Sequence, residues 1–191
     1  FQFSFPSDNR PVYLPVKEIL AHAPGFRSLM STRQMPFERV YKDILDLAFL
    51  PPMKELSAEW SKIAEDICRV LKANRVGFEG ERFFLETNSG TFDFMMVAEG
   101  WRKLALLLLL INNGAIHPGV HLFWDEPDTN LNPKLLRVVA EALLAMQRRG
   151  VQIFLATHNY VLLKEFDLLA KPGDSVRYHA LYQENEDEGV L

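Results

Sequence analysis

The sequence predicts an α/β protein whose sheet is mostly parallel. Residues 120–124 and 151–156 are short apolar segments with the length of buried strands. A helix-forming stretch separates them, which is the order of a right-handed β-α-β unit with parallel strands. The chain has 191 residues, 48% of them hydrophobic, which suffices for one domain with a sizeable core and excludes a disordered or fibrous protein.

Composition excludes several classes of protein and site. Lys and Arg number 21 against 25 Asp and Glu, so the net charge of −4 does not favour nucleic-acid binding, although a local basic patch stays open. Cys68 is the only cysteine, which excludes an internal disulfide and a zinc site built on cysteines. The longest apolar run, residues 104–111, is shorter than the ~20 residues of a membrane helix, and no signal peptide is visible. We therefore expect a cytoplasmic protein without a membrane partner.

The first part of the chain predicts a short strand and then a helical arm. Residues 1–5 alternate apolar and polar side chains, as a short strand does. Residues 16–74 have the pattern of a helical arm or lid inserted before a core of residues 75–191, all within a single partial domain. Pro51 and Pro52 end the first helix of this arm, and Ser57 can cap the second. The apolar faces of the two helices are Phe37, Val40, Tyr41, Ile44, Leu45 and Ala48, and Trp60, Ile63, Ala64, Ile67 and Leu71.

The elements after this arm follow from a change of period. Apolar side chains alternate between residues 76 and 94, with turn residues at 79–80 and 88–90, which predicts a small antiparallel meander. A helix is expected at about residues 99–112. The helix between the two parallel strands begins with Asn132 as its N-cap and Pro133 in its first turn, and Gly150 suits its end.

Polar side chains that can carry chemistry follow both strands of the predicted parallel sheet. Asp125, Glu126 and Asp128 come after the first strand, and Thr157-His158-Asn159 follows the second. Open α/β sheets bind ligands at the carboxyl ends of their strands. Carboxylates buried there need a positively charged partner. A bound Mg²⁺ would be such a partner, because it prefers oxygen ligands.

The same residues suit phosphoryl transfer, which requires mainly positioning and charge neutralisation. One carboxylate can hold the metal while its neighbour polarises a water for attack on a phosphate. His158 can donate a hydrogen bond to the γ-phosphate. A third segment, Ala98-Glu99-Gly100, stands at a helix start, where free N–H groups and the positive end of the helix dipole favour an anion such as phosphate.

Four segments together resemble ABC-type ATPase heads. Residues 120–126 resemble their Walker B strand, residues 128–132 their D-loop, residues 157–159 their switch-histidine loop, and residues 98–100 a shortened signature motif. Each segment alone also fits an ordinary turn or helix start, but the four in this order are specific. Order and spacing are similar to those of SMC, Rad50 and RecF-like proteins, and most similar to the AAA15/AAA21 group of ATPases and its OLD-family relatives. The resemblance covers about residues 95–165 and implies a P-loop NTPase-like fold.

The resemblance also implies a role for each matching residue. Asp125 would hold Mg²⁺, Glu126 would be the general base, and His158 would sense the γ-phosphate of ATP. Two heads would sandwich two ATP molecules in a homodimer that gates an effector protein or a DNA or RNA transaction. No residue is assigned to nucleic acid. The residues that would contact nucleotide from the signature motif and the D-loop are Glu99, Gly100, Asp128 and Asn130.

The chain also departs from that family pattern. No Gly-x-x-x-x-Gly-Lys-Ser/Thr occurs in its 191 residues, and Ala98 stands where the signature motif usually has Ser. We therefore expect a C-terminal portion of a longer ATPase, inactive by itself. Two other hypotheses stay open: an interaction module that keeps the ATPase fold without binding nucleotide, and a metal-dependent nuclease with Asp125, Glu126 and Asp128 as ligands.

Overall fold

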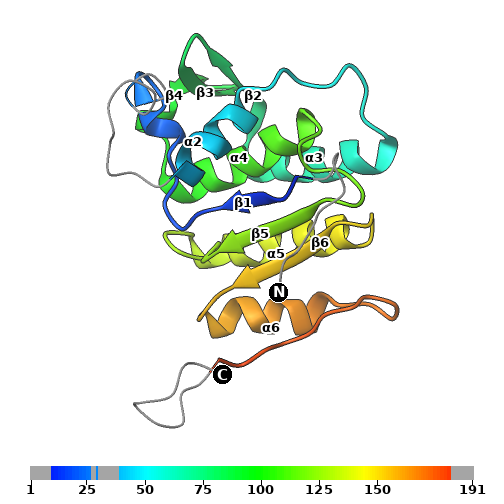
Figure 1. Cartoon of the computed structure of the whole chain (residues 1–191). Coiled ribbons are helices and arrows are strands. Elements are labelled where there is room, and N and C mark those ends of the chain that lie inside the picture. The colour runs from blue at the N-terminus through cyan, green and yellow to red at the C-terminus, as the bar shows by residue number, and fades with distance from the viewer. Residues whose placement is uncertain (1–9, 27–28, 30–38, 182–191) are drawn as a thin grey trace, which may run out of the picture.

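A parallel sheet lies at the centre of the molecule (Figure 1). The computed structural model of the chain describes residues 10–26, 29 and 39–181. The strands β1 (Val12–Leu14), β5 (His121–Asp125) and β6 (Gln152–Ala156) form the sheet in the order β1-β5-β6. Both β1 and β6 pair with β5 in parallel, which confirms the predicted α/β class. The predicted first strand, residues 1–5, lies outside the described residues.

The helix α5 (Pro133–Gln147) connects β5 to β6 and covers one face of the sheet (Figure 1). Asn132 caps it as predicted, because its side chain accepts a hydrogen bond from Lys134 N at 3.0 Å. Gly150 has a φ of 88°, a left-handed conformation that turns the chain from the helix toward β6. The helix α6 (Tyr160–Leu169) follows β6 and packs against α5.

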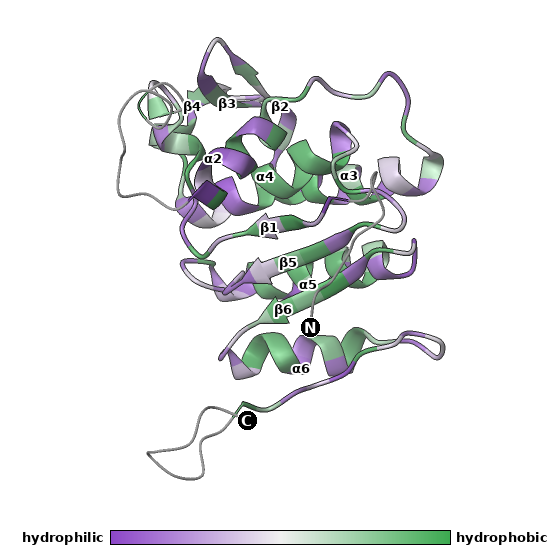
Figure 2. Cartoon of the chain, in the orientation of Figure 1, coloured by the Kyte–Doolittle hydropathy of each residue, from purple (hydrophilic) through white to green (hydrophobic). Residues whose placement is uncertain are grey.

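The helix α4 (Glu99–Asn112) lies beyond β1, on the side away from β5, and forms the centre of the core there (Figure 1). It is hydrophobic on all sides along its last two turns, and the whole run Leu104–Ile111 is buried, as such a pattern requires. The helices α2 (Arg39–Ala48) and α3 (Ala58–Leu71) pack on it (Figure 2). Within the ranges described above, no helix is both long and apolar enough to cross a membrane.

The predicted helical arm, residues 16–74, is helical only in part. Its described portion contains α2, α3 and the short 3₁₀ helix η1 (Leu20–His22), while residues 50–57 form an extended connection. Pro51 and Pro52 account for this break, since each lacks a backbone donor. The last residues of the predicted arm, Ala73 and Asn74, already belong to strand β2.

The predicted antiparallel meander is confirmed. Its strands are β2 (Ala73–Glu79), β3 (Arg82–Thr87) and β4 (Gly90–Asp93), paired in sequence order. Phe83 is fully buried under this sheet and its ring contacts that of Phe49 at a centroid distance of 4.6 Å. A second 3₁₀ helix, η2 (Phe94–Met96), then leads directly into α4.

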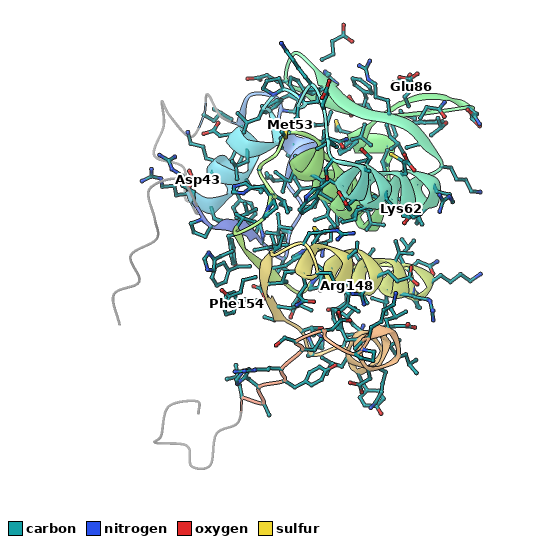
Figure 3. All side chains as sticks on the ribbon, turned by 90° about the vertical axis from the view of Figure 1, so that its right-hand side faces the viewer. Asp43, Met53, Lys62, Glu86, Arg148 and Phe154 are labelled. Carbon is teal, nitrogen blue, oxygen red and sulfur yellow. The ribbon has the colours of Figure 1, made fainter. Side chains whose placement is uncertain are left out.

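The face of the parallel sheet opposite α5 carries a row of aromatic side chains. Tyr13, Phe123 and Phe154 are register neighbours on β1, β5 and β6. The rings of Phe123 and Phe154 stack at 4.7 Å with an interplanar angle of 8°. Figure 3 shows Phe154 on the side of the sheet away from α5, and 45% of its surface is exposed. This row lines an open groove along the sheet.

A buried ion pair fastens the segment after β1 to the start of α4. Arg102 Nε lies 2.5 Å from Glu18 Oε2, and the Glu18 side chain is fully buried. The other carboxylate oxygen accepts from Leu20 N. Arg102 also donates to the carbonyl oxygens of Phe94 and Val97 at 3.0 and 2.8 Å. Burial raises the pKa of Glu18, and the neighbouring guanidinium opposes this effect.

We predict that Arg102→Met lowers the free energy of unfolding by about 3–5 kcal/mol at pH 8, because it leaves a buried carboxylate unpaired. Burial holds the pKa of Glu18 in the folded protein above its usual 4.5. As the pH falls toward 4.5, the Glu18 carboxyl of the folded variant takes up a proton and is no longer an unpaired buried charge. The destabilisation caused by Arg102→Met therefore lessens at low pH. Urea unfolding at several pH values measures both effects. The control is Arg69→Met, which removes only an exposed pair with Asp66 and is expected to cost less than about 1 kcal/mol. Equal losses for the two variants would contradict the role of the buried pair.

Candidate functional site

The ends of β5 and β6 bring together the two polar segments that the sequence singles out. Asp125 pairs with Ala156 in the parallel register, so Glu126 and Thr157 leave the sheet side by side. Glu126 N donates to Ala156 O at 2.9 Å, which extends the pairing by one residue. Beyond this point, His158 Nδ1 lies 3.2 Å from Glu126 Oε1. The predicted base and the predicted phosphate sensor therefore lie at one site.

Glu126 has an unusual backbone conformation that directs its side chain. Its φ is 43°, in the left-handed region that costs a non-glycine residue roughly 1–3 kcal/mol. A turn holds it there, because Thr129 N donates to Glu126 O at 3.2 Å. Thr129 Oγ1 also donates to Glu126 Oε2 at 2.8 Å. The carboxylate is thus oriented by Thr129 and His158 and remains 34% exposed, so water reaches it.

Asp125 lies at the end of β5, beside the edge strand β1. Its Oδ2 accepts a long hydrogen bond of 3.4 Å from Tyr13 of β1. Within the described ranges, no three His, Cys, Asp or Glu side chains form a group that could hold a metal ion. Mg²⁺ at a nucleotide site needs only one or two carboxylates, since phosphates and waters complete its shell. The partly buried Asp125 carboxylate next to Glu126 fits that requirement.

Asp128 connects the two loops. It is buried, and its Oδ1 accepts a hydrogen bond of 2.6 Å from Thr157 Oγ1. Thr157 Oγ1 in turn accepts from Asn159 N at 3.0 Å. The Asp128 carboxylate therefore contacts Thr157 of the loop after β6, while that of Glu126 contacts Thr129 and His158. This arrangement does not form the three-carboxylate metal centre that the nuclease hypothesis requires.

The segment Ala98-Glu99-Gly100 packs against the loop after β5. Asn130 Nδ2 donates to Glu99 Oε2 at 3.0 Å. A Cβ on Gly100 would lie 2.8 Å from Asn130 O and 3.2 Å from Leu131 Cα. The start of α4 therefore requires glycine here, because another backbone lies where a side chain would be. The four residues proposed for nucleotide contacts are thus divided: three meet at this junction, and Asp128 lies toward β6.

Lys103 is a residue of this site that the sequence analysis did not single out. It lies one turn into α4, is only 3% exposed, and donates to Glu126 O at 3.1 Å and Thr129 O at 2.8 Å. Burial lowers its pKa, an effect opposed by the carboxylates of Glu99, Asp128, Glu126 and Glu18. The sequence offered one sign of its role: a single lysine stands at the start of a long apolar run, on the side of a helix that is expected to be buried.

We predict that Gly100→Ala lowers the free energy of unfolding by about 1–3 kcal/mol, because the new methyl group must displace the loop at Asn130. In a helix without such a contact, the same change would stabilise the protein by about 0.5–1 kcal/mol. Urea unfolding measures this change, and its sign distinguishes the two cases. A higher free energy of unfolding in Gly100→Ala would contradict the close approach of Asn130 to Gly100. Gly77→Ala is the control, since its Cβ would meet only side-chain atoms of Phe84 and Arg75.

Two solved structures of SMC proteins are similar to this chain. One is the Smc head domain with an extended coiled coil bound to the C-terminal domain of ScpA, derived from Pyrococcus furiosus. It is 15% identical with a TM-score of 0.43, and the match covers 56% of this chain but only 30% of that chain. The other comes from work on ATP-driven dimerization and DNA stimulated activation of SMC ATPases. It is 11% identical with a TM-score of 0.48, covering 69% of this chain and 83% of that chain.

Family membership follows from the sequence. No curated protein matches the chain. One family profile, AAA21, described as "AAA domain, putative AbiEii toxin, Type IV TA system", matches residues 4–164, which is most of the chain and includes both polar loops. The expected resemblance to the AAA15/AAA21 group is therefore confirmed, and the chain belongs to this AAA-type ATPase domain family.

Proposed function

We propose that this chain is part of an ATP-hydrolysing head, in which the loops after β5 and β6 act on one ATP molecule. The observation that carries the proposal is the 3.2 Å approach of His158 to Glu126, one residue beyond Asp125. Acid and imidazole groups from two different strand ends converge there, at the edge where open α/β sheets bind ligands. Membership of an AAA-type domain family supports a nucleotide as that ligand.

In this proposal the three side chains have separate tasks. Asp125 would hold Mg²⁺, which neutralises charge on the phosphate oxygens when it is bound. Glu126 accepts a proton from the water whose oxygen attacks the γ-phosphorus, and the bond to the β-phosphate oxygen breaks as ADP leaves. His158 is 79% exposed and can reach a γ-phosphate oxygen with a donated hydrogen bond. Thr129 keeps the Glu126 carboxylate in place for this step.

The start of α4 and the adjoining loop are proposed to contact ATP held mainly by a second subunit. Glu99, Gly100 and Asn130 form one surface there, joined by the Asn130–Glu99 hydrogen bond, and Asp128 ties this loop to the loop after β6. A homodimer that closes on ATP would thereby couple hydrolysis to an effector protein or to DNA or RNA in the cytoplasm. The chain spans 30% of the Smc head chain that it matches, so this activity is proposed for the full-length protein.

One observation favours a second function, that of an interaction module without nucleotide binding. Ala98 occupies the N-cap of α4 and offers no side-chain hydrogen bond there. Isothermal titration calorimetry of the full-length protein with ATP separates the two functions. Binding that requires Mg²⁺ supports the ATPase, and absence of binding supports the module.

We predict that Glu126→Gln in the full-length protein lowers the rate of ATP hydrolysis by about 10²–10⁴-fold, because the amide cannot accept the proton of the attacking water. ATP remains bound, so the variant accumulates as a dimer. Phosphate release and analytical ultracentrifugation with Mg-ATP measure the two effects. Glu141→Gln is the matched control, an exposed glutamate on α5 that pairs with Arg137. Turnover at the wild-type rate in Glu126→Gln would reject Glu126 as the base.

A further inference from the structure

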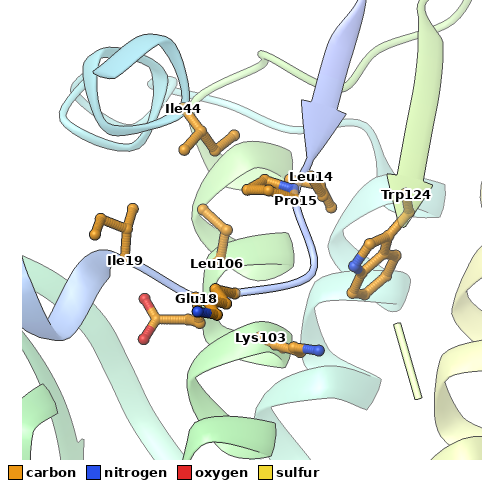
Figure 4. Close-up of a pocket in the computed structure, with 9 residues that line it drawn as sticks. Leu14, Pro15, Glu18, Ile19, Ile44, Lys103, Leu106 and Trp124 are labelled. Carbon is orange, nitrogen blue, oxygen red and sulfur yellow. The ribbon is translucent and has the colours of Figure 1, made fainter. Parts of the chain in front are cut away.

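Lys103 carries a positive charge into an apolar part of the core. Its side chain borders a cavity of about 10 Å³ whose other walls include Leu14, Leu106 and Trp124 (Figure 4). An ammonium group removed from water is costly unless the protein satisfies its donors. A lysine at this position therefore needs hydrogen-bond acceptors that offset the cost of its burial, and the identity of these acceptors indicates its role.

The partners of Lys103 are carbonyl oxygens, although a buried carboxylate is close by. Glu18 borders the same cavity, but it pairs with Arg102. Figure 4 shows the side chains of Glu18 and Lys103 pointing in opposite directions. The two hydrogen bonds of Lys103 go instead to Glu126 O and Thr129 O. The ammonium group is thus directed at the loop after β5.

These two carbonyls belong to the first and last residues of the turn that begins at Glu126. Donation to both by one ammonium fixes the distance between the ends of the turn. It also offsets the cost of the left-handed conformation of Glu126, whose φ is 43°. A relaxed φ at this residue would turn the carboxylate away from Thr129 Oγ1 and His158, since both contacts depend on the direction of its side chain.

We propose that Lys103 is a positioning residue for ATP hydrolysis, which holds the turn from Glu126 to Thr129 so that the Glu126 carboxylate faces the nucleotide side of the site. This inference rests on the proposed function. Lys103 is buried beneath the loop and acts through Glu126 rather than on the nucleotide. Its loss is therefore expected to slow the chemical step more than it weakens ATP binding, because Lys103 does not touch the nucleotide and Asp128, in the same turn, is also held by Thr157.

The test compares three variants of the full-length protein. Lys103→Met keeps the length of the side chain but removes the charge and the donors, and is expected to lower kcat by roughly 10- to 100-fold with a much smaller change in the KM for ATP. Lys103→Arg keeps the charge and can donate to both carbonyls, so it restores a large part of kcat. Lys62→Met, at an exposed lysine on α3 (Figure 3), keeps the wild-type kcat and KM. Hydrogen exchange in residues 125–131 is expected to rise in Lys103→Met alone.

Each outcome of these measurements supports or overturns the positioning role of Lys103. A fall in kcat that exceeds any rise in KM, with recovery in Lys103→Arg, supports the positioning role. Wild-type kcat in Lys103→Met overturns it and leaves the ATPase proposal intact, whereas no Mg-ATP hydrolysis by the wild-type protein overturns both. If Lys103→Met does not melt cooperatively, the test uses Lys103→Gln, whose neutral amide has a shorter reach than the lysine ammonium. An unchanged kcat in this variant, or a rise in KM equal to the loss in kcat, overturns the positioning role.

Discussion

The parallel pairing of β5 with β6 is the constraint on which the proposed site depends. Parallel strands in register end at the same edge, so the residues that follow them leave the sheet as neighbours. The hydrogen bond from Glu126 N to Ala156 O continues this order by one residue. Two further contacts, between Thr157 and Asp128 and between His158 and Glu126, then connect the loops. A shift of register by one residue would displace the loop after β6 along β5 and separate these pairs of side chains.

The helix α4 supplies the second constraint, because it supports the loop after β5 from within the core. Its run Leu104–Ile111 is buried on all sides, which anchors the helix in the core. Gly100 lets the backbone of Asn130 approach closely, and Lys103 donates to the turn at Glu126. One helix thus determines where the loop after β5 lies and which conformation its turn adopts. The Glu18–Arg102 pair fastens this helix start to the segment after β1.

Much of the fold could be predicted because its signals are local. The Asn132 cap, the alternating residues of the meander and the apolar strands each depend on near neighbours in sequence, and the structure confirms these elements. The sequence also predicted that Glu126 and His158 follow two strands that end at one edge of the sheet, whereas their contact depends on the in-register pairing of β5 with β6. The break at residues 50–57 was predictable too, because Pro51 and Pro52 end one helix of the arm and Ser57 stands before the next.

What the sequence could not predict depends on tertiary contacts. The positive φ of Glu126 has no signal in its residue type, and the burial of Asp128 against Thr157 joins residues 29 positions apart. Lys103 lies at a helix position that a charged residue normally occupies on the surface, and only the packed core shows that it points inward. The roles of these residues in catalysis stay predictions, because they require a nucleotide and a second subunit.

The most direct measurement is a crystal structure of the full-length protein with Mg²⁺ and a non-hydrolysable ATP analogue. Our account predicts the metal beside Asp125, with the Glu126 carboxylate and the His158 ring both within hydrogen-bond reach of the γ-phosphate or of a water aligned with it. A nucleotide bound away from the ends of β5 and β6, or a triphosphate that only one of these two side chains can reach, would contradict it.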